Sequence, residues 1–306
     1  MHCIISFSLL FFISAYGDDV NDYLTSVKSD IKSIKIENII PYYKNKKIML
    51  EKVISSYYLS FDKSMRIIEE INGGDKVVSF RKKYSYKDNK NEIKSYCKNI
   101  IQSGNLELSD VIKNICSDRV KEISEIKTEY SEDGEPILIS FTLKNNNNEE
   151  TYVFNSAYEM EERIIKKYNE SKNILSEEKY DSKEDLLFRK VYQEKDFLYF
   201  IITYNKDGII KEQIKKEYRP DKTLRKETLT GYSYSGNISS KKEIFYNKYL
   251  LKEEEKLYDS NDSLYKDYIF EYSLDAKGNW IREIKYERDA LGNKTPVSAV
   301  KRIITY

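Results

Sequence analysis

The sequence predicts a mainly β protein, a long antiparallel β-meander of repeated strand-turn units with a small helical insert. Three observations lead to this prediction. Tyrosines recur at even spacings in the second half of the chain, turn-forming residues follow most of them, and apolar residues alternate with charged ones between the turns. Turn signals every ~8–12 residues between short strands are typical of antiparallel all-β chains.

The tyrosine series defines the repeat. Its members are 12 or 14 residues apart within two runs, which are Tyr168, Tyr180, Tyr192, Tyr204, Tyr218 and Tyr232, then Tyr234, Tyr246, Tyr258, Tyr272 and Tyr286. Turn clusters such as Asn205-Lys206-Asp207-Gly208 and Asp275-Ala276-Lys277-Gly278 follow these tyrosines. Each unit is therefore expected to be one strand plus one tight turn, and even spacing is what a meander of constant register requires.

We expect three regions along the chain: a signal peptide at residues 1–17, an N-terminal mixed β region at 18–160, and a tyrosine-periodic β-repeat region at 161–306. In the second region, residues 47–61, 64–72, 76–86, 123–131, 136–144 and 149–155 have the composition of strands. A helical insert is expected at about 91–117, because Ile93, Tyr96, Cys97 and Ile100 follow the helical period and Ser109 is placed to cap a second short helix.

The first residues resemble a cleaved leader. Ile4 to Ser14 form an apolar run of signal-peptide length, too short for the ~20 residues of a membrane-spanning helix, and Ala15-Tyr16-Gly17 supplies a small-x-small cleavage site. We therefore expect an exported protein, in the periplasm, at the cell surface or outside the cell. No later segment is long enough to predict a transmembrane helix in the mature chain.

Removal of the leader leaves two cysteines, Cys97 and Cys116. An even number of cysteines in an oxidising compartment predicts one disulfide, which would join the two helices of the insert. Two buried thiols are the alternative.

The stretch from Tyr258 to Tyr306 resembles the YD or Rhs-type repeats of exported bacterial proteins. Tyr272 with Asp275 to Trp280 and Tyr286 with Asp289 to Asn293 match the tyrosine, turn aspartate and turn glycine of that repeat, and Tyr180-Asp181 keeps the dipeptide. The resemblance covers roughly residues 168–306. It implies structural β-sheet meanders or shells without catalytic activity of their own.

Composition argues against several kinds of chemistry. The 52 Lys and Arg nearly cancel the 51 Asp and Glu, so a nucleic-acid partner is not expected. The single histidine, His2, lies in the leader, which removes Ser-His-Asp and Cys-His catalysis and histidine-ligated zinc from the mature chain. We predict no catalytic residue, no metal ligand and no cofactor. An enzyme that used carboxylates, Tyr or Lys is the third-ranked hypothesis.

Aromatic residues are the one feature with a candidate binding role. Tyrosine and tryptophan rings suit sugar stacking or protein contacts, and the possible binding face comprises Tyr180, Tyr204, Tyr232, Tyr258 and Trp280. The alternative is structural, with rings that fill the sheet edge. We therefore expect an exported, non-enzymatic protein with a structural or protein-interaction role at the cell envelope, or else a binder of glycan or peptidoglycan through the aromatic sheet face.

Overall fold

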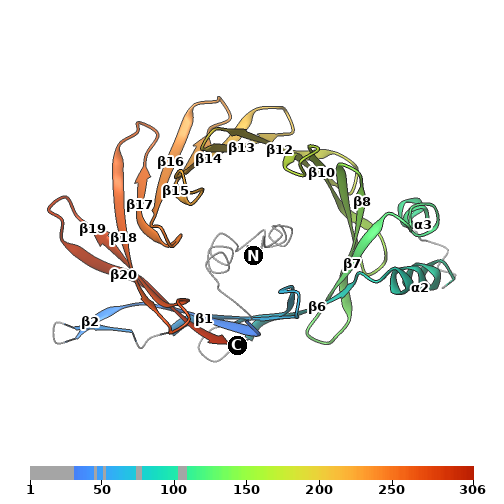
Figure 1. Ribbon diagram of the computed structural model, residues 1–306, viewed down its shortest axis with the longest axis horizontal. Helices are drawn as coiled ribbons and strands as arrows, with labels where there is room; N and C mark the ends of the chain where they lie inside the picture. Colours follow the sequence, from blue (N-terminus) through green and yellow to red (C-terminus); the bar gives the residue numbers. More distant parts are fainter. Residues whose placement is uncertain (1–30, 45–46, 51–52, 74–77, 103–108) are drawn as a thin grey trace. The chain divides into compact units, whose positions relative to one another are not determined.

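A computed structural model describes residues 31–44, 47–50, 53–73, 78–102 and 109–306, and Figure 1 shows its ribbon. The predicted leader at 1–17 lies outside these residues. The described residues form β-strands and two short helices, which confirms the mainly β class and the helical insert. No helix among them is long and apolar enough to cross a membrane.

The chain divides into two compact units that interleave in sequence, one drawn from residues up to 80, 245–255 and 267–306, the other from 81–244 and 256–266. The first unit contains β1 (Ser33–Ile39), β2 (Tyr42–Lys44), β3 (Lys47–Met49), β4 (Val53–Phe61), β5 (Ile67–Gly73), β19 (Trp280–Arg288) and β20 (Lys294–Thr305).

The second unit contains α2 (Lys90–Gln102), α3 (Asp110–Ser117), β7 (Ile123–Tyr130), β8 (Pro136–Asn145), β9 (Asn148–Asn155), β10 (Met160–Tyr168), β11 (Ile174–Asp181), β12 (Leu186–Lys195), β13 (Leu198–Asn205), β14 (Ile210–Tyr218) and β15 (Leu224–Tyr232). Four strands have residues in both ranges: β6 (Val78–Lys87), β16 (Ile238–Tyr246), β17 (Lys252–Tyr258) and β18 (Leu264–Leu274).

Eighteen of these strands belong to one antiparallel sheet, and β2 and β3 form a separate pair. From β4 to β20 each strand of the sheet pairs with the next in sequence, while β1 pairs with both β20 and β4. The order of hydrogen-bonded strands thus returns to its starting strand, as in a closed β-barrel. The predicted antiparallel meander is confirmed from β4 to β20, and its closure through β1 was not predicted. The repeat pattern could not reveal the closure, because turn signals report only neighbours in sequence, whereas β1 and β20 meet across most of the chain.

One turn geometry recurs between the strands. The side-chain oxygen of Asn205 accepts the backbone N–H groups of Asp207 and Ile209, at 3.0 and 2.9 Å, and Gly208 has a φ of 78°. Asp181, Asp259, Asp275 and Asp289 accept backbone N–H groups in the same way. The strand-turn unit that the tyrosine spacing predicts is therefore confirmed.

In these turns and in others of the same kind, the position whose backbone N–H donates to the carbonyl three positions earlier is left-handed. Gly208, Gly236, Gly278 and Gly292 occupy it in some turns, and Glu184, Lys222, Leu250 and Asp262 occupy it in others. Asparagine and aspartate favour these turns because their side chains satisfy backbone N–H groups locally. The turns therefore form even where the glycine is missing.

The helical insert packs on one face of β7, β8 and β9. Ile93, Ile112 and Ile115 from the helices join Phe141 and Phe154 from the strands in one buried cluster, and Figure 1 shows α2 and α3 side by side next to β7. Ser109 Oγ accepts the Ile112 N–H at 3.5 Å, so the predicted cap of the second helix is present. We call this side of the sheet the helix-bearing face.

Beyond the helices, the strands of the second unit are partly exposed on both faces. Nearly all side chains of β13, β14 and β15 are half-buried, irrespective of the face to which they point. Ion pairs connect neighbouring strands there, for example Lys216 to Glu227 at 3.1 Å and Lys226 to Glu243 at 2.8 Å. Cross-strand pairs of this kind contribute roughly 0.2–1 kcal/mol each, so these charges stabilise the pairing of neighbouring strands.

Candidate binding surface

Four of the five predicted aromatic residues belong to the second unit and lie at the ends of alternate strands. Tyr180, Tyr204, Tyr232 and Tyr258 lie at or next to the last residue of β11, β13, β15 and β17. Successive strands of an antiparallel sheet run in opposite directions. The last residues of alternate strands therefore lie at the same end of the sheet, and all four tyrosines are at that end. We call these four residues the tyrosine row.

Strand register places the first two members of the row on one face. Residues directly opposite one another on paired strands point to the same side of a sheet. Glu178 is two residues from Tyr180 on β11 and lies opposite Arg189 on β12, and Arg189 lies opposite Tyr204 on β13. Tyr180 and Tyr204 therefore share a face.

Side-chain contacts extend this face to the other two members. The hydroxyl of Tyr232 donates to the side-chain oxygen of Gln213 at 3.1 Å, and the hydroxyl of Tyr258 donates to Glu243 at 3.1 Å. Glu243 also accepts a bond from Lys226, which is an even number of residues from Tyr232 on β15. The tyrosine row is therefore continuous over β11 to β17.

The face that carries the row is the helix-bearing face. Arg163 of β10 lies opposite Tyr180 on one side and Tyr152 of β9 on the other. Tyr152 belongs to the buried cluster beneath α2 and α3. The tyrosine row thus continues, strand by strand, the face on which the helices pack. Its four side chains are half-buried, so part of each remains accessible.

Trp280, the fifth predicted residue, does not share this surface. It lies in the first unit and is only 3% exposed. The Arg302 guanidinium carbon is 4.2 Å from the centre of its ring, and Tyr272 meets it edge to face at 5.9 Å. Trp280 is therefore a core residue. No feature of the local sequence distinguishes it from the four half-buried tyrosines.

The remaining tyrosines of the first run lie on the opposite face. Tyr168, Tyr192 and Tyr218 come near the last residues of β10, β12 and β14, at the other end of the strands. The ring centre of Tyr199 on β13 lies 6.3 Å from that of Tyr192. Burial, together with nearby Glu149 and Glu177, raises the pKa of Tyr168 to about 12. Sequence reasoning treated the series as one set. The alternation of strand direction could have divided it into two.

Charged residues form a line across the opposite face. Lys166 of β10 lies opposite Glu149 of β9 and Glu177 of β11, and Glu177 lies opposite Lys190 of β12. Lys166 Nζ is 3.2 Å from Glu149, and Lys190 Nζ is 3.6 Å from Glu177. Both carboxylates are buried, so these lysines neutralise charges that would otherwise be costly.

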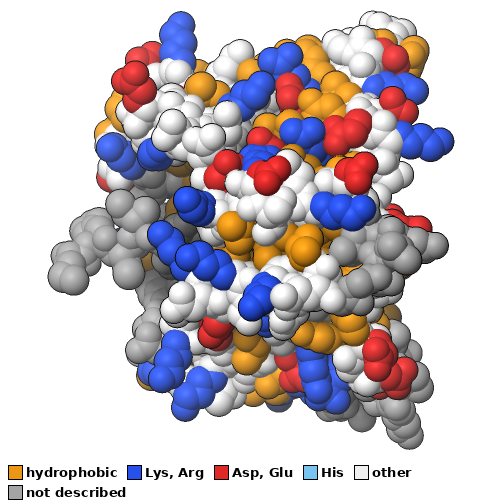
Figure 2. Space-filling model, turned by 90° about the vertical axis from the view of Figure 1, so that its right-hand side faces the viewer, with side chains coloured by type: hydrophobic (Ala, Val, Ile, Leu, Met, Phe, Trp, Pro, Cys, Tyr) orange, Lys and Arg blue, Asp and Glu red, His pale blue; other side chains and the backbone are white. Residues whose placement is uncertain are grey.

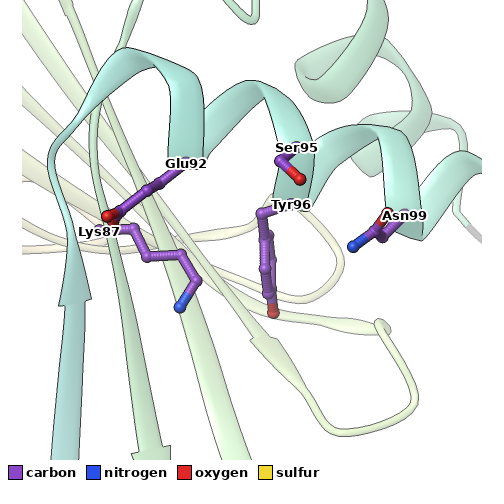
Figure 3. A pocket seen from close by; sticks show the side chains of 5 residues that line it. All are labelled: Lys87, Glu92, Ser95, Tyr96 and Asn99. Carbon is purple, nitrogen blue, oxygen red and sulfur yellow. The ribbon is translucent and has the colours of Figure 1, made fainter.

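A shallow depression lies beside helix α2, where Lys87 at the end of β6 faces Tyr96 (Figure 3). Its volume is about 380 Å³, and Glu92, Ser95 and Asn99 complete its lining. Lys87 Nζ is 5.4 Å from the centre of the Tyr96 ring. Burial raises the pKa of Tyr96 above its ordinary value. The sequence identified Tyr96 only as a residue of the predicted helix, and these five residues share no motif.

Cys97 of α2 and Cys116 of α3 are joined as a disulfide in the structure, and both side chains are buried in the cluster beneath the helices. In the part of the chain that the structure describes, no group of three or more His, Cys, Asp or Glu side chains is arranged to hold a metal ion.

Comparisons with known proteins give similarities in structure alone. No protein-family model matches the chain, and no curated protein matches it. A porin-like protein from Bacteroides uniformis ATCC 8492 is 8% identical over 90% of this chain and 96% of that chain, with a TM-score of 0.43. A porin-like protein from Bacteroides vulgatus ATCC 8482 is 12% identical over 90% of this chain and 98% of that chain, with a TM-score of 0.35.

The resemblance to YD or Rhs-type repeats is wrong. The strand order closes on itself rather than continuing as an open repeat array. The tyrosine and turn-aspartate pattern that carried the resemblance has a local explanation, because it is what recurring hairpins of this turn geometry require.

Proposed function

We propose that the protein is an exported, non-enzymatic component of the cell envelope that acts through the surface of its sheet. The closed strand order carries this proposal. A sheet without free edges does not pair with strands of other chains, so its long strands can be exposed without aggregating. The leader pattern and the cysteine pair support an exported location.

The two faces of the sheet favour contact with water. On β14, the helix-bearing face has Gln213, Lys215 and Glu217, and the opposite face has Glu212 and Lys216. A Lys at the middle of a bilayer on the lipid-facing side of a sheet costs roughly 2–4 kcal/mol. Because each face of β14 carries a lysine, this cost would arise whichever face was in contact with lipid.

A porin-like position in the outer membrane is the alternative location, because a closed sheet is the only kind of sheet that can cross a bilayer. Fractionation of the producing cells distinguishes the two. Our proposal expects release by osmotic shock or by a high-salt wash. Retention in outer membranes after carbonate extraction would favour the porin-like alternative, and an uncleaved chain in the cytoplasm would contradict both.

Glycan binding through the tyrosine row is the second candidate function. The observation in its favour is that four half-buried tyrosines lie on one face of the sheet and at the same end of its strands. Aromatic rings with a polar rim suit sugar contacts. The test is retention of the purified protein on peptidoglycan sacculi, and a protein that stays entirely in the supernatant counts against this function.

A further inference from the structure

Helix α2 carries three exposed lysines in one line. Lys90, Lys94 and Lys98 follow one another at intervals of four residues, and all three are exposed. Residues four apart are neighbours on the surface of a helix, separated by about 6 Å along its axis. Ile101 is seven residues after Lys94, which is about two helical turns, so it lies on the same side, and it is 43% exposed. We call these four residues the basic face.

The lysines of the basic face have no acidic partner. No Asp or Glu lies three or four residues from any of them along the helix, and among the residues that the structure describes none of the three takes part in an ion pair. Like charges four residues apart destabilise a helix. The sheet of the second unit differs, because there lysines contact carboxylates of neighbouring strands, as Lys216 contacts Glu227 at 3.1 Å. The basic face is therefore a group of cations without compensation.

The acidic residues of the two helices lie elsewhere. Glu92 is on another side of α2, at the depression that also contains Lys87 and Tyr96 (Figure 3). Asp110 of α3 is 3.6 Å from Lys113. Figure 2 looks onto the side of the molecule that carries α2 and α3, and cationic side chains are visible across the middle of that view. An anionic partner can therefore contact the basic face without meeting a carboxylate within it.

The other side of α2 holds the basic face in place. Ile93, Cys97 and Ile100 are buried in the cluster between the helices and the sheet, and the bond between Cys97 and Cys116 joins α2 to α3. A partner that binds the basic face therefore meets a helix that is already ordered, so that little of the binding free energy is spent on ordering it.

Charge and the exposed isoleucine together favour an anionic bilayer as the partner. Each lysine near an anionic lipid surface adds roughly a fivefold factor to membrane affinity, so three lysines add roughly 100-fold. Ile101 lies among the lysines, where an apolar side chain can enter the boundary between lipid headgroups and acyl chains. A soluble polyanion would use the lysines but would gain nothing from Ile101.

We propose that the basic face docks the protein on the surface of an anionic phospholipid bilayer, with the three lysines at the lipid phosphates and Ile101 between them. This inference rests on the exported location in the proposed function. It also gives a reason for the release expected in a high-salt wash, because salt screens the attraction between exposed charges.

The experiment measures cosedimentation of the purified mature protein with vesicles of equal parts phosphatidylglycerol and phosphatidylcholine, and with vesicles of phosphatidylcholine alone. We expect binding to the first vesicles only, and loss of that binding at high salt. Lys90→Gln/Lys94→Gln/Lys98→Gln is expected to lower the affinity roughly 100-fold. The corresponding triple Arg variant keeps the charge and is expected to bind as the parent does, whereas Ile101→Ser is expected to bind severalfold more weakly.

The matched control is Lys183→Gln/Lys206→Gln/Lys211→Gln. It removes the same charge from three exposed lysines of the second unit that lie outside the helices. These lysines lie within or near turns that also contain aspartates, so the control is expected to bind as the parent does. Circular dichroism reports whether the helices are intact in each variant.

Two results would overturn the inference. Absence of binding to phosphatidylglycerol vesicles would refute it, as would equal losses in the helix variant and its control. Undiminished binding by Ile101→Ser, together with equally tight binding of the parent to inorganic polyphosphate, would replace the bilayer by a soluble polyanion. Neither result bears on the exported location, which cell fractionation tests separately.

Discussion

Lys222 occupies, in the turn between β14 and β15, the left-handed backbone position that Gly208 occupies in the turn between β13 and β14, with φ values of 64° and 78°. A side chain in this conformation costs roughly 1–2 kcal/mol relative to glycine. Glycine recovers only part of that cost, because it also loses more backbone entropy on folding. Substitution by glycine at the left-handed turn positions that hold another residue is therefore expected to stabilise the protein.

Lys222→Gly is therefore expected to raise the free energy of unfolding by roughly 0.5–1 kcal/mol, measured as a higher urea midpoint with an unchanged slope. Gly208→Ala is expected to lower it by a similar amount. Lys206→Gly is the control, since Lys206 is not among the residues with positive φ, and it should give no gain. A destabilised Lys222→Gly variant would contradict this explanation of the turns.

Stability should decrease in acid because of the turn aspartates. Hydrogen bonds from the Asn293 side chain and then from the Asn293 backbone N–H lower the pKa of Asp289, and bonds from Thr223 lower that of Asp221. A carboxylate with a lowered pKa in the folded state stabilises the fold above its unfolded pKa of about 3.9, and this contribution is lost as the pH falls below that value.

We therefore expect the urea midpoint to be level above about pH 5 and to decrease below about pH 4. Asp289→Asn keeps a turn acceptor but does not titrate, so it should make this decrease shallower. Asp133→Asn is the control, because Ser131 is the side-chain acceptor in that turn. An acid transition identical in Asp289→Asn and the parent would refute the assignment.

Reduction of Cys97 and Cys116 should loosen the helical insert. The two cysteines are 19 residues apart, and on the chain-entropy model a bridge over a loop of this size stabilises by roughly 3 kcal/mol. Cys97→Ala/Cys116→Ala is expected to lose helical circular dichroism at a lower temperature than the β-sheet signal. Mass spectrometry after alkylation without reductant tests the bond itself, and labelling of both thiols would show that it is not formed.

Lys166 is expected to contribute far more to the free energy of unfolding than its neighbour Lys167. Lys166 lies between the buried carboxylates of Glu149 and Glu177, so Lys166→Met leaves two carboxylates with less compensation, at a cost of roughly 1.5–3 kcal/mol. Lys167 is exposed and points to the other face, and Lys167→Met should change stability by less than about 0.5 kcal/mol. Equal effects of the two changes on the urea midpoint would contradict the proposed charge line.

Local features of the fold could be predicted because their causes are local. The turn at Asn205 to Gly208 follows from side-chain acceptors that act within four residues, and the insert follows from the helical period of Ile93, Cys97 and Ile100. The pairing of β1 with β20 could not be predicted in this way, since it joins Ser33 to Thr305 and leaves no signal in either segment.

The candidate surface was predictable in composition but not in arrangement. Tyr180 and Tyr192 are each 12 residues from the next tyrosine of the series. They nevertheless lie at opposite ends of the strands and on opposite faces of the sheet. The difference arises because strand direction reverses at every turn, a property of the assembled sheet. Trp280 is buried because β20 supplies Arg302 against its ring, and that contact again depends on distant parts of the chain.

Strand β1 also determines when folding can finish. Ser33 lies opposite both Thr305 and Ser60, so β1 is positioned from both sides only after β20 has been synthesised and, in an exported chain, translocated. Until then β4 and β20 each present an unpaired edge, and contacts at this sequence separation form slowly. The slowest folding step is therefore expected to be the docking of β1, and the partly folded chain is most exposed to aggregation just before it.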